Sequence, residues 1–395
     1  MNDLGLAKPQ TAPTLEELVG RAEALLPRLR ERAVETERNR RLPDVSVQEF
    51  REAGFPKIFA PPRFGGYGLG IDAAAAVVST LSSACASSGW VANLFMNHNW
   101  MVSLFPMQAQ EEYWDGSSDR LISTASLATR SQMDVVDGGY RLTGRWKFSS
   151  GCDFADWFII MKPSSTSADW MLLPRSDVTI EDDWFTSGLC GTGSRDIILD
   201  NVFVPSHRVA AAADVQTGNS EGGHAHGLPL LKVPFGLGAS WAIPPVLVGA
   251  AAGMADAVRQ SLIGKKALFT GELQVERAPN QIRLAEALTD IHAAELVMRH
   301  RTAEIMTWAK AGGAPSPLEA ATSGRDASYV ARLVTRVADS LSLMAGAQSI
   351  YLANPVQRFL RDIHAGATHV SLVWEEHAER YGRALWDLPP KVPGK

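Results

Sequence analysis

Two adjacent serines are the first residues of this sequence whose type and placement could do chemistry. Ser149 and Ser150 stand in the stretch GYRLTGRWKFSSGCDFADW (Gly139–Trp157), directly before Gly151. A glycine lets the backbone approach a flat ligand closely, and two hydroxyls beside it can donate hydrogen bonds to that ligand. The pair therefore indicates a ligand site, although a serine pair that merely ends a strand of a β-rich domain fits the same residues.

Three histidines are further candidates for chemistry, because an imidazole can accept or donate a proton near neutral pH. His364 and His369 lie in a helical pattern that reads QRFLRDIHAGATHVSLVWEEHAERYGRALW, and His98 lies in an apolar helical stretch between two asparagines. From the residues alone, His98 has the pattern of a core histidine with satisfied hydrogen bonds. By contrast, His224 and His226 stand in a glycine-rich stretch without a Cys or carboxylate cluster, so we expect no metal site there.

The elements that must position these side chains change character along the chain. Thr14 and Glu17 form a capping-box pattern ahead of apolar residues at helical spacing, and residues 72–105 are rich in small residues that permit close helix packing. From Leu121 the period changes to two, which predicts strands and includes a strand pair with a tight turn around Gly144. The remainder contains four long apolar-faced helical segments, which suggest an antiparallel bundle.

The order helix, strand, helix predicts an α+β fold with three domains. We expect an N-terminal α-helical domain at residues 1–118, a middle β domain at 119–212 and a C-terminal four-helix bundle at 213–395. A polar, flexible loop at residues 212–230 precedes the bundle. Val233–Ala255 carries no charge over a length that could span a bilayer, but its prolines and glycines favour a buried helix packed among other helices.

Composition restricts the class of partner. The net charge of −5 and the pI near 6.0 give no support for a nucleic-acid or anionic-membrane partner. The three cysteines, Cys85, Cys152 and Cys190, have no CxxC spacing, which is typical of a reducing compartment. The first residues carry acidic side chains and no apolar signal-peptide core, so we expect a cytoplasmic protein that acts on a small molecule.

The serine stretch and the last helical stretch together resemble the acyl-CoA dehydrogenase fold, and within it the two-component flavin-dependent monooxygenases. A third stretch, WFTSGLCGTGSRDIILDNVFVP (Trp184–Pro205), is similar to the GLxGTGSxD element of these monooxygenases. The residues that match this element are Gly188, Gly191, Thr192, Gly193, Ser194 and Asp196. The resemblance spans residues 15–387 and implies an acyl-CoA dehydrogenase-like arrangement of the three domains.

The last helical stretch separates two activities within this fold. Acyl-CoA dehydrogenases remove a substrate proton with a glutamate, but the matching positions here, counted from Arg361, are His369 and Val370. The monooxygenases have a histidine at the place of His369. The resemblance therefore implies an oxygenase component that uses reduced flavin and O2 through a C4a-hydroperoxyflavin to hydroxylate a phenol- or indole-like aromatic or heteroaromatic molecule. An acyl-CoA dehydrogenase or oxidase with bound FAD is the alternative, and a non-catalytic binding protein of this fold stays open.

The same resemblance implies roles for individual residues. His369 would donate a proton as the oxygen adduct forms, His98 would orient or deprotonate the substrate, and Ser149 would hold the flavin N5. The predicted cofactor-binding residues are Trp146, Ser149 with Ser150 as its neighbouring alternative, Ser126 with Ser123 as its alternative, Arg283 and Gln348.

The cofactor implied by the resemblance is reduced FMN, with FAD as the alternative, and O2 is the co-substrate. No GxGxxG opens a βα unit in this sequence, which argues against a nicotinamide site. Reduced flavin would therefore come from a separate NAD(P)H-dependent flavin reductase. The resemblance also implies assembly, since bundles of this fold pair into dimers and tetramers, and Arg283 matches a position that holds the flavin phosphate, often across a subunit boundary. We therefore expect a homotetramer with a small aromatic substrate and with neither nucleic acid nor membrane as a partner.

Overall fold

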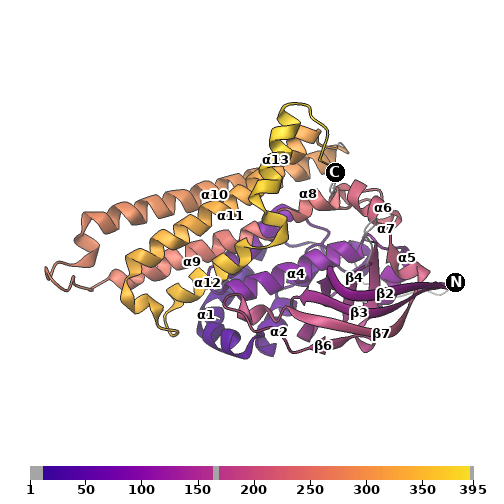
Figure 1. Cartoon of the computed structure of the whole chain (residues 1–395), viewed down its shortest axis with the longest axis horizontal. Helices are drawn as coiled ribbons and strands as arrows, with labels where there is room; N and C mark the ends of the chain where they lie inside the picture. Colours follow the sequence, from indigo (N-terminus) through magenta and orange to yellow (C-terminus); the bar gives the residue numbers. More distant parts are fainter. Residues whose placement is uncertain (1–11, 163–168, 313, 392–395) are drawn as a thin grey trace.

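The computed structural model describes residues 12–162, 169–312 and 314–391. The helices are α1 (Leu15–Asn39), α2 (Asp44–Glu52), α3 (Ile71–Ser82), α4 (Ala86–Val102), α5 (Met107–Trp114), α6 (Ala212–Thr217), α7 (Glu221–His226), α8 (Phe235–Ala239), α9 (Pro244–Leu262), α10 (Ala278–Ala311), α11 (Pro317–Ala345), α12 (Pro355–Ala367) and α13 (Trp374–Leu385). The strands are β1 (Ile122–Ala125), β2 (Leu127–Val136), β3 (Gly139–Ser149), β4 (Trp157–Met161), β5 (Trp170–Pro174), β6 (Thr179–Glu181), β7 (Arg195–Pro205) and β8 (Val209–Ala210). The strands gather at one end of the molecule, and the long helices α9, α10 and α11 extend side by side away from them (Figure 1). The predicted α+β class is confirmed.

The first helix begins where the sequence predicts. The Glu17 backbone N–H donates to Thr14 Oγ1 at 3.1 Å, and the Thr14 N–H donates to Glu17 Oε2 at 2.8 Å, which is a complete capping box. Leucine and alanine side chains at helical spacing then bury one face of α1, which packs against α3. The N-terminal helical layer is therefore set by a local cap and an apolar stripe.

Two four-stranded sheets form the β region. The first has the order β1-β4-β5-β8, with β1 parallel to β4 and antiparallel pairs elsewhere. The second is antiparallel throughout, in the order β2-β3-β7-β6. Ser149 at the end of β3 pairs with Arg195 at the start of β7. This register brings the serine pair beside the GTGSRD segment.

The predicted turn around Gly144 is wrong. β3 runs through this position as one strand, and the turn that connects it to β2 lies at Asp137 and Gly138. Gly144 instead stands where the register between β3 and β7 shifts, and a Cβ there would lie 2.5 Å from the Arg130 carbonyl oxygen. The close approach of β2 therefore requires glycine at this irregular point of the strand.

Hydrophobic side chains of the described residues gather in two cores. The larger core joins the N-terminal helices to α9, α10, α11 and α12, so the two predicted helical domains share one interior. The smaller core fills the space between the two sheets and includes Leu142, Trp146 and Phe158. α4 contacts both α9 and β1, and thus lies between the helical bundle and the sheets (Figure 1). The junction of the two cores runs along α4.

The uncharged stretch Val233–Ala255 belongs to the larger core. It forms α8 and most of α9, with an interruption before Pro244 and Pro245, which occupy the first turn of α9. The helical segment 235–262 has the length and hydropathy of a membrane span, and 67% of its most apolar window is buried inside the protein. The stretch is thus packed as a core helix, as predicted.

The final predicted helix is two helices. α12 and α13 are separated by a short 3-10 turn at Val370–Leu372. His369 stands at the N-cap of this turn, where its ring accepts the Ser371 backbone N–H at 3.2 Å. The polar cap competes with continuation of the helix, because the Nδ1 atom satisfies a backbone donor that a helix would leave to a carbonyl. His369 is therefore presented on a turn and not on a helix face.

The predicted loop at residues 212–230 contains the two short helices α6 and α7. Ser220 caps α7 by accepting a backbone N–H. His224 and His226 each hydrogen-bond to a side-chain amide oxygen, at 2.8 and 2.7 Å. In the part of the chain that the structure describes, no group of three His, Cys, Asp or Glu side chains is placed to hold a metal ion.

Candidate active site at the serine cluster

Five hydroxyl side chains meet where β1, the end of β3 and the GTGS segment come together, and we call them the serine cluster. Ser149 Oγ lies 2.7 Å from Ser123 Oγ. Ser150 Oγ lies 2.6 Å from Ser194 Oγ, which in turn lies 2.6 Å from Thr192 Oγ1. All five side chains are buried. The tertiary structure therefore joins the predicted serines to the GLxGTGSxD element, which is distant from them in sequence. The members of the cluster are Ser123, Ser149, Ser150, Thr192 and Ser194.

The donors of the serine cluster can be assigned because two of its protons have carbonyl partners. Ser123 donates to the Ser150 carbonyl oxygen at 2.7 Å, so Ser149 donates to Ser123. Thr192 donates to a backbone carbonyl at 2.8 Å, so Ser194 donates to Thr192 and Ser150 donates to Ser194. Every hydroxyl proton is used within the protein. Ser149 therefore keeps acceptor lone pairs and no free proton.

Trp90 on α4 joins the serine cluster to His369. Its indole N–H donates to Ser150 Oγ at 3.1 Å. Its ring meets the His369 ring edge to face, with the ring centroids 5.8 Å apart. Trp90 could not be predicted as a site residue from the sequence, because a tryptophan in an apolar helix has the pattern of an ordinary core residue. Its place between a histidine and a serine makes it part of the site.

The neutral His369 ring carries its proton on Nε2. Its Nδ1 accepts the Ser371 backbone N–H at 3.2 Å and lies 2.8 Å from Ser371 Oγ, so Nδ1 has no proton of its own. Burial lowers the pKa of His369, which favours the neutral ring at neutral pH. No described residue accepts a hydrogen bond from Nε2. The Nε2–H group is therefore the donor that His369 offers to a ligand.

His98 on α4 has the opposite tautomer. Its Nδ1 lies 3.0 Å from the Ile122 carbonyl oxygen, which can only accept, so the proton is on Nδ1 and Nε2 is free to accept. Burial lowers the pKa of His98 to about 4, which keeps the ring neutral at neutral pH. Ile122 directly precedes Ser123 in β1. His98 is thus tied through β1 to the serine cluster, and it offers an acceptor where His369 offers a donor.

Acid is expected to destabilise the fold through His98. The pKa of this ring is about 4 in the folded protein against 6.5 in the unfolded chain, so the unfolded chain binds more protons between these values. The contribution of His98 is therefore complete above pH 6.5 and is lost as the pH falls toward 4, by about 3 kcal/mol of unfolding free energy. Urea unfolding at a series of pH values from 7.5 to 4.5 measures this slope.

A His98→Gln variant is the test of that assignment, because glutamine keeps a polar side chain that does not titrate. The slope of unfolding free energy with pH should be shallower in this variant. His364→Gln is the matched control, since His364 is an exposed histidine paired with Asp339. Parallel slopes for His98→Gln and the wild type would show that His98 does not carry the acid sensitivity.

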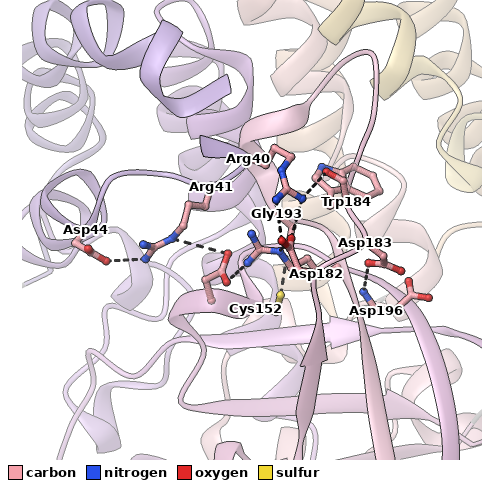
Figure 2. A network of polar contacts seen from close by, with 11 residues as sticks. Arg40, Arg41, Asp44, Cys152, Asp182, Asp183, Trp184, Gly193 and Asp196 are labelled. Atoms are coloured by element: carbon pink, nitrogen blue, oxygen red, sulfur yellow. Dashed lines mark hydrogen bonds and ion pairs between the residues drawn. The ribbon is translucent and has the colours of Figure 1, made fainter. Parts of the chain in front are cut away.

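An ion-pair network fixes the segment that ends in Ser194 (Figure 2). Arg40, at the C-terminal end of α1, donates to both carboxylate oxygens of Asp182 at 2.7 and 2.8 Å. Arg195 donates to the same carboxylate at 3.1 Å and pairs with Asp153 on its other side. Bidentate arginine–carboxylate pairs hold geometry as well as charge. The network thus anchors the end of α1 and the GTGSRD segment to each other beside the serine cluster.

Two of the three stretches that carry the resemblance touch each other, the Trp184–Pro205 stretch and the last helical stretch. The Leu189 backbone N–H donates to Asp362 Oδ1 at 2.6 Å, and a Cβ at Gly188 would lie 2.2 Å from the Arg361 carbonyl oxygen. Burial raises the pKa of Asp362 to about 7. The glycine therefore permits the loop before the GTGS segment to close on α12. This contact holds α12, and the His369 turn that follows it, against the site.

The structure brings together some of the predicted site residues and separates others. Trp146 is fully buried in the smaller core, where its indole N–H donates to the Met161 carbonyl oxygen at 2.9 Å, so its side chain packs within the protein. Ser126 is exposed between β1 and β2 and has no hydrogen-bonding partner among the described residues. Arg283 on α10 and Gln348 are also exposed. Their contacts with a cofactor stay predictions.

The start of α10, which carries Arg283, and the turn between α11 and α12, which carries Gln348, lie at the end of the bundle that points away from the sheets (Figure 1). Gln348 precedes the 13-residue helix α12 and His369 follows it. At 1.5 Å per residue, this helix separates the two by about 20 Å. Within one chain, Gln348 and His369 therefore lie at opposite ends of α12.

Phe148 is the exposed residue next to the serine pair, and the sequence analysis did not find it. Its side chain is 55% exposed, and its φ of 67° places a bulky residue in the left-handed region. Such backbone strain collects at functional sites. The ring meets Trp184 edge to face, with the ring centroids 6.1 Å apart. No sequence signal reports a positive φ at a phenylalanine.

The surface beside the serine cluster fits a flat ring system that makes hydrogen bonds. Phe148 and Trp184 present aromatic rings, and Ser126 presents an unpaired hydroxyl. Ser149 directly follows Phe148 in the chain, and its buried hydroxyl keeps acceptor lone pairs that the described residues do not use. Aromatic surface with a few placed polar groups is what a planar heteroaromatic cofactor requires. The residues present therefore fit a flavin.

Comparison with known proteins identifies the family of this chain. Residues 19–114 match the acyl-CoA dehydrogenase N-terminal domain, and residues 241–374 match the acyl-CoA dehydrogenase C-terminal domain. The oxygenase subunit of a flavin-dependent monooxygenase from Rhodococcus jostii is 36% identical over 376 residues, which cover 93% of this chain and 98% of the relative. The oxygenase component of the FADH2-dependent resorcinol hydroxylase from Rhizobium sp. is 34% identical over 408 residues, which cover 99% of both chains.

Solved structures give the same result. The 3-HSA hydroxylase from Rhodococcus sp. RHA1 has a TM-score of 0.89 at 34% identity, covering 95% of this chain and 98% of that one. XiaF from Streptomyces sp., in complex with FADH2 and glycerol, has a TM-score of 0.89 at 27% identity, covering 96% and 97%. The predicted oxygenase class is confirmed over the acyl-CoA dehydrogenase alternative. The chain belongs to the oxygenase subunits of the flavin-dependent monooxygenases, which are built on the acyl-CoA dehydrogenase fold.

Proposed function

We propose that this oxygenase hydroxylates a small aromatic molecule that carries a dissociable O–H or ring N–H, a phenol being the first choice. The observation that carries the proposal is the pair of neutral histidines with opposite tautomers, both tied to the serine cluster. His98 offers an acceptor at Nε2, and His369 offers a donor at Nε2–H. A phenol needs such an acceptor, because loss of its proton makes the ring electron-rich enough to attack oxygen.

The protein residues have separate tasks in this reaction. Reduced flavin, when bound, supplies the two electrons with which O2 gives one oxygen atom to the substrate and one to water. His98 takes the proton of the substrate, and His369 supplies a proton on the oxygen side. Ser149 offers an acceptor to the N–H at N5 of a reduced flavin, with Ser150 as the alternative. Trp90 and the buried cluster exclude water from these groups.

Leu94 supports the position of the substrate pocket. It is the one residue of α4 that is not buried. It lies four residues after Trp90 and four residues before His98, and residues at this spacing share a face of a helix. An apolar side chain with accessible surface between the two is suited to the flat face of an aromatic ring. We therefore propose Leu94 as the floor of the substrate pocket.

A phenol and its methyl ether are the substrates that test this function. With reduced FMN supplied by a flavin reductase under 18O2, the phenol should gain one 18O atom. The methyl ether, which has no proton for His98, should react at least about 10²-fold more slowly. Equal turnover of both would overturn the proton transfer to His98. Release of H2O2 alone with every phenol and indole tried would overturn the proposed substrate class.

Substitution of Leu94 is expected to change the size of substrate that the protein accepts. Leu94→Phe should raise KM for a bicyclic substrate about 10- to 200-fold, since that is the usual range for steric discrimination in an apolar pocket. A single-ring phenol should be affected far less. Leu94→Met, which conserves volume, is the control. Steady-state kinetics with both substrates measure the effect, and an unchanged ratio of their kcat/KM values would place the pocket elsewhere.

The remaining features of the proposal concern assembly and location. Relatives are oxygenase components, which supports a separate NAD(P)H-dependent flavin reductase as the source of reduced FMN or FAD. Arg283 and Gln348 are exposed, as are large apolar side chains in the loop before α10 and in the turn between α11 and α12, namely Leu268, Phe269 and Tyr351. This supports a homotetramer in which these residues reach the cofactor of a neighbouring subunit. The three cysteines are buried and unpaired, which supports a cytoplasmic location.

A further inference from the structure

Ser371 is the residue that orients His369. Its backbone N–H and its hydroxyl both meet Nδ1 of His369, at 3.2 and 2.8 Å. These two contacts place the ring proton on Nε2 and hold the ring edge against Trp90. Both contacts come from one residue of a short 3-10 turn. The ring orientation of His369 therefore depends on whatever holds Ser371.

A second histidine holds Ser371 from the other side. His377 Nε2 on α13 lies 2.9 Å from the Ser371 carbonyl oxygen, and a carbonyl can only accept, so His377 donates. The distance and direction of this bond lock the turn to α13. The chain of contacts therefore runs from His377 through Ser371 to His369. His377 itself is not one of the groups proposed to contact the flavin or the substrate.

Gly324 on α11 makes room for the His377 ring. A Cβ at this position would lie 2.7 Å from His377 Nδ1. Glycine inside a long helix is unfavourable by about 1 kcal/mol relative to alanine, and Gly324 is not among the residues with positive φ. The backbone conformation therefore does not require glycine here. Glycine is required because a side chain at this position would occupy the space of the His377 imidazole.

α13 is attached to the rest of the protein mainly through α11. None of its residues is buried. Its contacts with α11 include Trp374 against Tyr329, with ring centroids 5.7 Å apart, and Arg325 over the Tyr381 ring at 4.2 Å. An amphipathic helix held mainly at its surface needs a directional contact to keep a fixed register with the turn. The His377 hydrogen bond is such a contact.

We infer that His377 is a positioning residue for oxygenation, which acts through Ser371 to fix the orientation and tautomer of His369. The inference rests on the proposed role of His369. It adds a histidine on the outer helix to the groups on which the proton donor depends. The tautomer of His369 can be measured without turnover, so the inference and the proposed function can fail separately.

The pair His377→Gln and His377→Leu tests the inference on the full chain. Glutamine keeps an N–H donor for the Ser371 carbonyl, and leucine has none. In protein labelled with 15N-histidine, the wild type and His377→Gln should show one His369 tautomer with the proton on Nε2. His377→Leu should show exchange between tautomers. A single Nε2–H tautomer in His377→Leu would overturn the inference.

Turnover gives the second readout. In His377→Leu, kcat for the hydroxylated product should fall about tenfold or more, with KM for the aromatic substrate little changed, because only the alignment of the proton donor is lost. His377→Gln should restore most of kcat. Gly324→Ala, which displaces the His377 ring, should reproduce the defect, and His364→Leu is the silent control.

A tautomer change without loss of kcat supports the positioning and overturns the catalytic role of His369. Equal losses in His377→Leu and His377→Gln would overturn the positioning.

Discussion

A His369→Ala variant is expected to form hydroxylated product about 10²- to 10⁴-fold more slowly than the wild type, the range in which a positioned proton donor contributes. The reason is that the Nε2–H of His369 has no acceptor among the described residues, while the ring lies against Trp90, which donates to Ser150 of the serine cluster. Electrons from reduced flavin should then appear as H2O2 in place of product. Product by chromatography and H2O2 by a peroxidase assay, in the same reaction, measure both quantities.

The control for this experiment lies five residues away. His364 is exposed on α12 and pairs with Asp339 at 2.8 Å, so His364→Ala should leave the ratio of product to H2O2 unchanged. Circular dichroism should show that both variants are folded, since His369 lies on a turn and not inside a helix of the core. Wild-type product yield in His369→Ala would remove His369 from the mechanism.

A His98→Ala variant is expected to lose about 10²- to 10⁴-fold in kcat/KM for a phenol at pH 7, because it lacks the proton acceptor at Nε2. The loss should shrink as the pH rises toward the pKa of the phenol, near 10, since the substrate then ionises in solution. The wild type should show no such rise. Its His98 has a pKa of about 4 and is already a neutral acceptor from pH 6 upward.

The pH profile of kcat/KM between pH 6 and 10 is therefore the decisive measurement for His98. A variant profile that rises by about one decade per pH unit identifies a missing base. His98→Gln should behave like His98→Ala, because an amide oxygen accepts a hydrogen bond but does not take the proton. If the kcat/KM profile of the variant runs parallel to that of the wild type at all pH values, His98 has a packing role. That role is the one expected of a histidine in an apolar helix.

Much of the fold could be predicted because its signals are local. The capping box of Thr14 and Glu17 starts α1 as expected, and the period of two predicts the strands that follow Leu121. The predictions that failed concern longer-range contacts. Gly144 has the sequence signature of a turn, but the close approach of β2 makes it an irregular point of one strand. The last helix breaks because the His369 ring captures the backbone N–H of Ser371.

The candidate site could be predicted only in part. The serine pair, His98 and His369 were found from residue type and resemblance, and the tertiary structure links them through Ser123 and Trp90. Trp90 itself could not be found, because nothing in its neighbours along the chain distinguishes it from a core tryptophan. The exposed Phe148 was also missed, since the strain that marks it is a property of the backbone.

By itself, the sequence determined which residues are available to move protons and to meet a flat ring. It also determined the order of helices and strands, because caps, period and turn residues act over a few positions. Only the tertiary structure decided that His98 is an acceptor and His369 a donor. Each tautomer is set by a backbone group, the Ile122 carbonyl in one case and the Ser371 N–H in the other. Which backbone group a side chain meets depends on the tertiary structure. The sequence does not specify it, because nearly every residue carries the same backbone carbonyl and N–H groups.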